Sequence, residues 1–233
     1  MLPLRDNVPT RHFPVVTVLL ILGNALVWWW QLMGASLEAD VYRYGYYACS
    51  VSGPCVFQPG VPEAELSWWA SAFTSMFMHG SWGHIVGNML FLWVFGNNVE
   101  DALGRVRFLV WYLLAGLAAV ATQTVVTLAF GSPEEASTPM IGASGAVSGV
   151  LGAYLLLLPT AKVLTLFGWL VVEVPALLYL GFWFLFQLWA GGYAVLYPET
   201  GGGVAFFAHV GGFVFGALTV HAVATRAPLR PRY

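Results

Sequence analysis

Two side chains far apart in the sequence, Ser144 and His209, are of the types that perform nucleophilic catalysis together. A serine hydroxyl is a weak nucleophile until a base removes its proton, and histidine suits that role near neutral pH. Ser144 stands at the start of the apolar run from Ala143 to Leu158, and His209 lies early in the run from Val204 to Ala224. We therefore expect an acyl-transfer site with Ser144 as nucleophile and His209 as base.

Acyl transfer also needs hydrogen-bond donors for the oxyanion that develops during the reaction. A helix that starts at Ser144 offers free backbone N–H groups, including that of Ser144 itself. His84 and Asn88 are four residues apart, hence on one helix face, and add side-chain donors. The alternative for His84 and Asn88 is a purely structural role as hydrogen bonds between helices.

A carboxylate that orients the histidine is not expected here. Every Asp and Glu falls in a loop, in a tail or near the cytoplasmic end of an apolar run, as Glu173 does. The pair is therefore predicted to be a dyad rather than a triad. His79 and His84 are five residues apart, which does not suit one helix face, and no HExxH motif occurs, so neither a metal nor a cofactor is expected. His12 and His221 are expected to take no part.

The composition is that of a membrane protein. The chain is 59% apolar and 9% charged, whereas soluble domains carry about 25% charged residues. A net charge of -2 gives no sign of a nucleic-acid partner, so the expected surroundings are the lipid bilayer. Six runs approach the roughly 20 residues that a helical span needs. They are Pro14 to Met33, Trp82 to Val99, Val106 to Phe130, Ala143 to Leu158, a run within Val163 to Ala190 that begins near Pro175, and Val204 to Ala224.

The charges predict how this all-α bundle of six transmembrane helices, a single domain, is oriented. With both termini in the cytoplasm, only Arg43 among the basic residues falls outside, as the positive-inside rule requires. Residues 1–13 and 225–233 are then cytoplasmic tails, and 34–81 is an outer interfacial loop. We expect a multi-pass protein of the cell (inner or plasma) membrane whose site opens to the extracytoplasmic side. The basic residues placed inside are Arg5, Arg11, Arg105, Arg107, Lys162, Arg226, Arg230 and Arg232.

This topology brings the polar side chains to one depth. The second, fourth and sixth spans all enter from the outer face, so His84, Asn88, Ser144 and His209 fall within about 10 Å of it, at roughly 1.5 Å of rise per residue. Such intramembrane polar groups are usually functional. This shared depth favours a single site.

Small residues predict how the fourth and sixth spans meet. Gly145-x-x-x-Gly149 and Gly212-x-x-x-Gly216 are small-xxx-small patterns that let helix backbones approach closely. Packing these faces together would bring the Ser144 hydroxyl to the His209 imidazole. The alternative is that the glycines and serines of these segments serve packing alone.

Three motifs in this order resemble those of the rhomboid intramembrane serine proteases. They are His79-Gly-Ser-Trp-Gly-His84-Ile-Val-Gly-Asn88, Gly142-Ala-Ser144-Gly145 and Ala208-His209-Val-Gly-Gly212-Phe-Val-Phe-Gly216. The resemblance runs from Pro14 to about Ala224. It implies Ser144 as nucleophile, His209 as base, and an oxyanion hole formed by His84, Asn88 and the Ser144 N–H. The implied substrates are transmembrane segments of other proteins, cut near the outer surface at helix-breaking sequences after small residues.

Two positions depart from the family pattern. Trp68-Trp69 is followed by Ala70-Ser71, where many members carry an arginine after a tryptophan in this loop. Ser148 stands where some members have an aromatic residue that stacks on the base. His209 must then be held differently, and glycine packing alone is one way.

Two other functions remain open from the residues. One is a catalytically inactive relative that binds and escorts membrane clients; the other is a small transporter, which would need polar groups continuing to the inner face. Cys49 and Cys55 lie in one polar region and suit a disulfide or two free thiols equally. The sequence indicates no oligomeric state.

Overall fold

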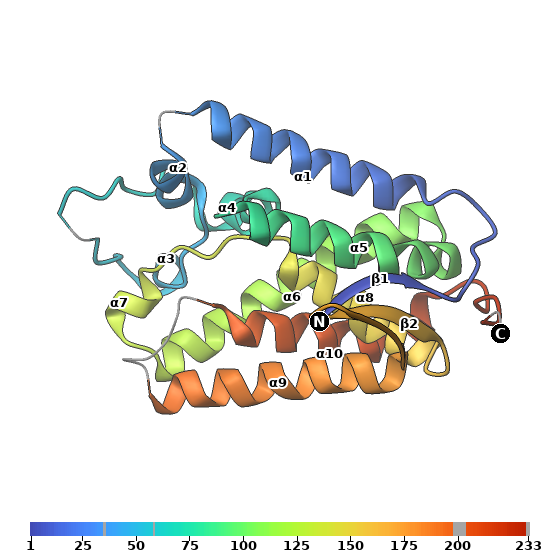
Figure 1. Ribbon diagram of the computed structural model, residues 1–233. Helices are drawn as coiled ribbons and strands as arrows, with labels where there is room; N and C mark the ends of the chain where they lie inside the picture. Colours follow the sequence, from blue (N-terminus) through green and yellow to red (C-terminus); the bar gives the residue numbers. More distant parts are fainter. Residues whose placement is uncertain (35, 58, 198–203, 232–233) are drawn as a thin grey trace.

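Helix α8 (Ser144–Leu157) is the buried centre of a helical bundle in the computed structural model, which describes residues 1–34, 36–57, 59–197 and 204–231 (Figure 1). Every residue from Gly145 to Tyr154 is buried, because glycine, alanine and serine let neighbouring helices approach. Helices α5, α6, α9 and α10 all contact α8. The other long helices are α1 (Val15–Met33), α5 (Trp82–Leu103), α6 (Arg105–Phe130), α9 (Ala176–Leu196) and α10 (Phe206–Val223).

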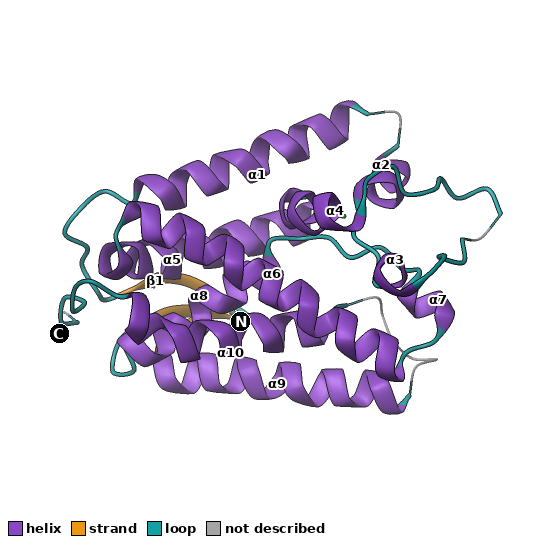
Figure 2. Cartoon of the chain, turned by 180° about the vertical axis from the view of Figure 1, so that it is seen from behind, coloured by secondary structure: helices purple, strands orange, loops and turns teal. Residues whose placement is uncertain are grey.

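The bundle is that of a multi-pass membrane protein. Within the described residues, α1, α6, α9 and α10 are long and apolar enough to cross a bilayer, and α8 is a shorter apolar helix. Helix α5 is long as well, although its last turns carry Glu100 and Asp101. Helices α1 and α9 lie at opposite edges of the bundle in both views and expose large apolar side chains (Figure 1, Figure 2). The count of six spans and the cytoplasmic termini stay predictions. Glu199 and Arg232 lie outside the described residues.

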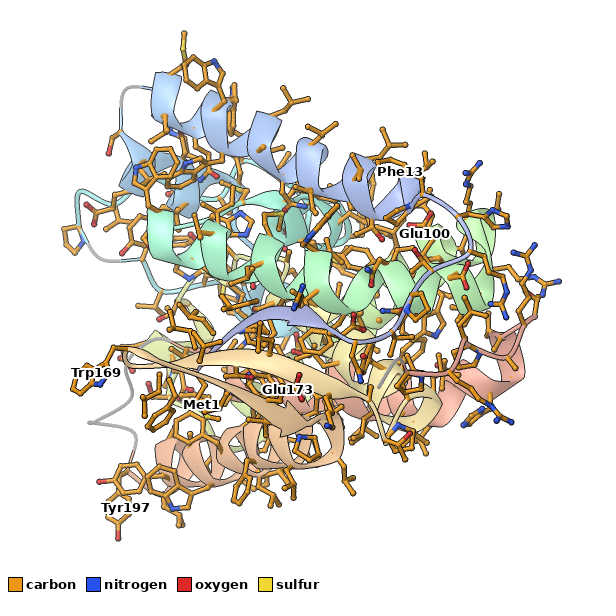
Figure 3. All side chains as sticks on the ribbon, turned by 45° about the vertical axis from the view of Figure 1, so that its right-hand side comes forward. Met1, Phe13, Glu100, Trp169, Glu173 and Tyr197 are labelled. Carbon is orange, nitrogen blue, oxygen red and sulfur yellow. A yellow bond between two sulfur atoms is a disulfide. The ribbon has the colours of Figure 1, made fainter. Side chains whose placement is uncertain are left out.

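The start of α1 is held from a distance by α5. Pro14 at its N-cap gives no side-chain cap, so the first N–H groups need another acceptor. Both carboxylate oxygens of Glu100 fill that need, accepting from the Val16 and Thr17 N–H groups at 3.0 and 2.7 Å. Figure 3 shows Glu100 beside the start of α1, near Phe13. This contact joins the N-terminal end of α1 to the C-terminal part of α5.

A three-stranded antiparallel sheet was not anticipated in a fold expected to be all-α. Strand β1 (Leu2–Asp6) pairs with β2 (Lys162–Phe167), which pairs with β3 (Leu170–Pro175). The predicted tail 1–13 is therefore partly a strand, and α9 begins at Ala176, directly after Pro175. Trp169, at the tip of the hairpin, is 91% exposed and points away from the bundle (Figure 3).

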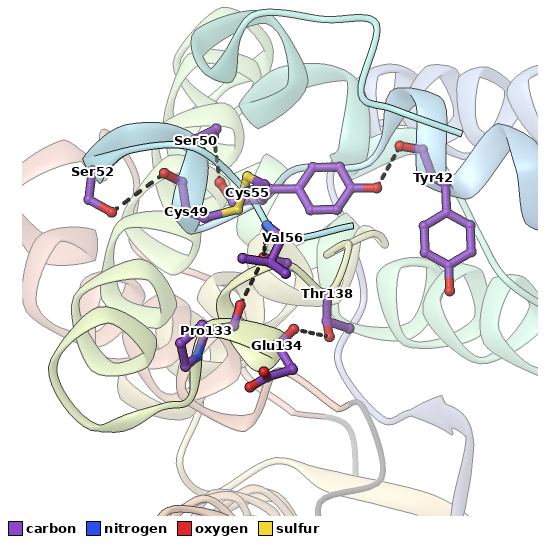
Figure 4. Close-up of a disulfide and its surroundings, with 11 residues drawn as sticks. Tyr42, Cys49, Ser50, Ser52, Cys55, Val56, Pro133, Glu134 and Thr138 are labelled. Atoms are coloured by element: carbon purple, nitrogen blue, oxygen red, sulfur yellow. Dashed lines mark hydrogen bonds between the residues drawn. A yellow bond between two sulfur atoms is a disulfide. The ribbon is translucent and has the colours of Figure 1, made fainter. Parts of the chain in front are cut away.

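The loop 34–81 is structured and is fixed to the segment that leads into α8. It contains α2 (Leu37–Tyr44), α3 (Cys49–Ser52), α4 (Trp68–Thr74) and the short helix η1 (Ser75–Phe77). Cys49 and Cys55 form a disulfide beside α7 (Pro133–Ala136), which decides between the two alternatives left open by the sequence (Figure 4). Tyr46 and Met140 exchange backbone hydrogen bonds of 3.0 and 2.7 Å. The loop thus holds the chain four residues before Ser144.

Candidate active site

Ser144 lies in the first turn of α8, two residues after a glycine whose backbone is in a conformation with positive φ. Gly142 has φ +117°, a conformation that favours glycine, and its N–H donates to the Ser75 carbonyl at 2.8 Å. The N-cap residue Ala143 makes no side-chain cap, so the first N–H groups of α8 are free of a capping side chain. The hydroxyl therefore lies at the positive end of a helix dipole, beside backbone donors.

Helix α10 brings His209 to this serine. The distance from His209 Nε2 to Ser144 Oγ is 2.9 Å, a hydrogen bond between residues 65 apart in the sequence. A Cβ added at Gly212 would overlap the Gly145 carbonyl oxygen, and one at Gly216 would overlap that of Gly149. The surface of α10 at Gly212 and Gly216, which carries no side chains, thus packs directly against the backbone of α8. The Cα atoms of Gly145 and Gly149 instead face α6, where an added Cβ would lie 2.6 Å from the alanine side chains.

The second ring nitrogen of His209 has a partner that the sequence did not predict. Gln187 Oε1 in α9 lies 2.8 Å from His209 Nδ1. Trp183, one turn earlier, lies against the same imidazole, with ring centroids 5.9 Å apart. Ser148, at the position where some relatives carry an aromatic residue, donates to the Ser144 carbonyl at 2.6 Å. Helix α9 therefore holds His209, in addition to the glycine contact. The signal available in the sequence was Gln187 itself, a polar residue within an apolar run.

His84 and Asn88 lie next to the dyad on α5. A Cβ added at Gly142 would lie 2.5 Å from His84 Nε2 and 3.6 Å from Ser144 Oγ, so the His84 ring adjoins the serine. Asn88 Nδ2 lies 3.0 Å from Nε2 of the buried His79, which leaves the second amide hydrogen of Asn88 free of that contact. His79 itself is fixed by Gln31, whose side chain bonds both its backbone N–H and its carbonyl at 3.0 Å.

All four side chains line one cavity of about 650 Å³. Its walls come from α2, α5, α8, α9, α10 and the segments 139–141 and 204–205. The hydroxyl, its base and the candidate donors thus share a space large enough for an extended peptide segment. Within the described part of the chain, no group of three or more His, Cys, Asp or Glu side chains is placed to hold a metal ion.

Comparison with known proteins identifies a family for most of the chain. The family model described as "Rhomboid domain" matches residues 66–226, more than half of the chain. Rhomboid protein 1, mitochondrial, of Saccharomyces cerevisiae is 33% identical over 150 residues, 64% of this chain and 40% of the relative. The human presenilin-associated rhomboid-like protein, mitochondrial, is 31% identical over 150 residues, 61% of this chain and 35% of the relative.

A bacterial relative carries an enzyme's name. Rhomboid protease GluP of Bacillus subtilis is 39% identical over 92 residues, 40% of this chain and 16% of the relative. The chain spans less than half the length of each of these relatives. With the family model covering α5 to α10, and with the helical membrane bundle described above, the chain belongs to the rhomboid family.

Proposed function

We propose that this protein is an intramembrane serine endopeptidase that cleaves transmembrane segments of other proteins near the outer membrane face. The observation that carries the proposal is the 2.9 Å contact between Ser144 Oγ and His209 Nε2. Support comes from the cavity around this pair and from a relative named as a protease. We place the protein in the cell membrane, with both termini cytoplasmic and the cavity opening outward. The distribution of arginine and lysine supports this orientation.

In the proposed reaction, His209 Nε2 takes the proton from Ser144 Oγ as the oxygen attacks the scissile carbonyl. The oxyanion accepts hydrogen bonds from the Ser144 N–H, from His84 and from Asn88. His209 then gives its proton to the leaving amine. Water attacks the acyl-enzyme with His209 again as base, and Ser144 is released.

Fluorophosphonate labelling of the purified protein tests this proposal against that of an inactive escort protein. These probes react with a serine only when it is activated as a nucleophile. We expect wild-type protein to be labelled and Ser144→Ala and His209→Ala to remain unlabelled at the same melting temperature. An unlabelled wild-type protein would favour the escort function, and labelled Ser144→Ala would refute the assignment of the nucleophile.

The same assay tests the oxyanion donors. Loss of one such donor costs about 100-fold to 1,000-fold in rate in serine hydrolases. We therefore expect His84→Ala and Asn88→Ala to be labelled much more slowly, while Trp82→Ala, on the exposed surface of the same helix, keeps the wild-type rate.

A further inference from the structure

We propose that Gln187 is a positioning residue that makes His209 a base of defined tautomer. This inference rests on the proposed function and names a third side chain for it. Gln187 is buried in α9, and its Oε1 lies 2.8 Å from His209 Nδ1. It does not touch the reacting atoms, and acts on them only through the imidazole.

The tautomer follows from the two contacts of the ring. To accept the Ser144 proton, Nε2 must carry a lone pair, and the neutral imidazole then has its hydrogen on Nδ1. That hydrogen needs an acceptor, because a buried donor without a partner costs free energy. The amide oxygen of Gln187 is such an acceptor. With the Gln187 amide oxygen turned toward the ring, as in the structure, the opposite tautomer would set the Nδ1 lone pair against an oxygen lone pair and lose this bond.

The same bond serves the charged form of the base. When His209 takes the serine proton, both ring nitrogens carry hydrogen, and a bond from a charged donor is stronger than one from a neutral donor. The Nδ1–H···Oε1 bond therefore strengthens as the proton moves. A glutamine gives this support without a negative charge inside the membrane, where a carboxylate would be costly.

Gln187 belongs to α9, so the support of His209 depends on a helix at the edge of the bundle. Ser144 and His209 come from α8 and α10, which meet through glycine, whereas Gln187 and Trp183 come from α9, whose other side exposes Phe182, Leu185 and Phe186. Helices α5 and α9 both line the cavity and contact each other through the rings of Phe91, Phe95 and Tyr179. A displacement of α9 away from α10 would therefore remove the acceptor from His209 Nδ1.

The test is the rate of fluorophosphonate labelling of Ser144 as a function of pH, in purified Gln187→Leu and Gln187→Glu. Leucine keeps the approximate volume but accepts no hydrogen bond, and we expect labelling to slow at least about tenfold, the cost of one buried hydrogen bond. Glutamate restores an acceptor, and its negative charge, which is costly inside the membrane on its own, pairs with the protonated histidine and favours it. Gln187→Glu should therefore recover much of the rate, with its pH midpoint moved to higher pH. Phe186→Leu, on the exposed face of α9, is the matched control and should match wild type.

The outcomes separate the two proposals. Wild-type rate and midpoint in Gln187→Leu would overturn the positioning role while leaving the dyad intact. Equal slowing of Gln187→Leu and Gln187→Glu, with an unmoved midpoint, would overturn it as well, because a structural role alone produces that pattern. Failure of the wild-type protein to react, by contrast, would remove the proposed function itself.

Discussion

Each nitrogen of the His209 imidazole has one partner, Ser144 on one side and Gln187 on the other. This asymmetry is what a proton-accepting histidine needs, since a ring free to rotate or to change tautomer would present Nε2 to the serine only part of the time. Neither of these two contacts involves a carboxylate. At the residue scale, the site therefore depends on neutral hydrogen bonds.

A second buried polar cluster lies near the C-terminal end of α8, around Asp6 of β1. Asp6 Oδ2 accepts hydrogen bonds from the Tyr154 hydroxyl at 2.5 Å and from Asn98 Nδ2 at 2.7 Å. Burial raises the pKa of Asp6 from 3.8 to about 6, although the Tyr154 bond opposes the shift. Because the pKa is raised in the folded state, Asp6 contributes stability that is complete below about pH 4 and is lost as the pH rises through about 6.

The pH dependence of thermal unfolding tests this cluster. We compare wild type with Asp6→Asn, whose amide oxygen still accepts both hydrogen bonds but does not titrate. The Tm of wild type relative to Asp6→Asn should rise as the pH is lowered from about 8 to about 4, with most of the change between about pH 6 and pH 4. A difference that does not vary with pH would show that Asp6 is not held in this environment.

At the scale of elements, the close contact of α8 and α10 sets the geometry of the dyad. Helix α6 adds a further tie, since Gln123 Oε1 accepts from the Ala208 N–H at 3.1 Å and holds the chain next to His209. At Gly212 and Gly216 the backbones of α8 and α10 are so close that no side chain fits between them. A larger residue at either position must therefore displace one of the two helices. Such a movement changes the distance between Ser144 and His209 directly.

Substitution of the contact glycine gives a sharp test at this scale. We expect Gly216→Ala to lower the unfolding free energy by about 1–3 kcal/mol through overpacking, and to slow the labelling of Ser144. Both effects are expected because the Cβ added at position 216 would overlap the Gly149 carbonyl oxygen. The control is Gly181→Ala in α9, where nothing lies within 4 Å of the added Cβ. Equal Tm and labelling rate for both variants would contradict the importance of this contact.

The long helices and the contact between Ser144 and His209 could be predicted from sequence because the governing signals are local. Apolar runs gave boundaries close to those of α1, α6 and α10, and the glycine patterns marked close surfaces. The sheet could not be predicted in this way. Its valine-rich stretches 162–167 and 170–175 run directly into the apolar segment that forms α9, so they look like part of one apolar run. In addition, β2 pairs with the N-terminal strand β1, which is distant in the sequence. Gln187 was missed for a related reason: which face of α9 meets α10 depends on tertiary packing, not on a motif.

At the scale of the whole molecule, a single site is built from segments that span the chain. The loop carrying the Cys49–Cys55 disulfide bonds to the segment before Ser144. Helix α5 supplies candidate oxyanion donors, and α8, α9 and α10 supply Ser144, Gln187 and His209. The lipid-exposed surfaces of α1 and α9 require a bilayer around this assembly. Activity is therefore expected of the whole protein in a bilayer rather than of any fragment.

The most direct measurement is a cleavage assay in liposomes, in which the purified protein meets test substrates with a single transmembrane span. Each substrate is tagged at both ends and carries a helix-breaking sequence with small residues near the outer end of its span. We predict that wild type produces two tagged fragments by a cut near the outer face, and that Ser144→Ala and His209→Ala, folded to the same Tm, produce none. Fragments of the same size from Ser144→Ala, or none from a wild-type protein that is folded and inserted, would contradict the account.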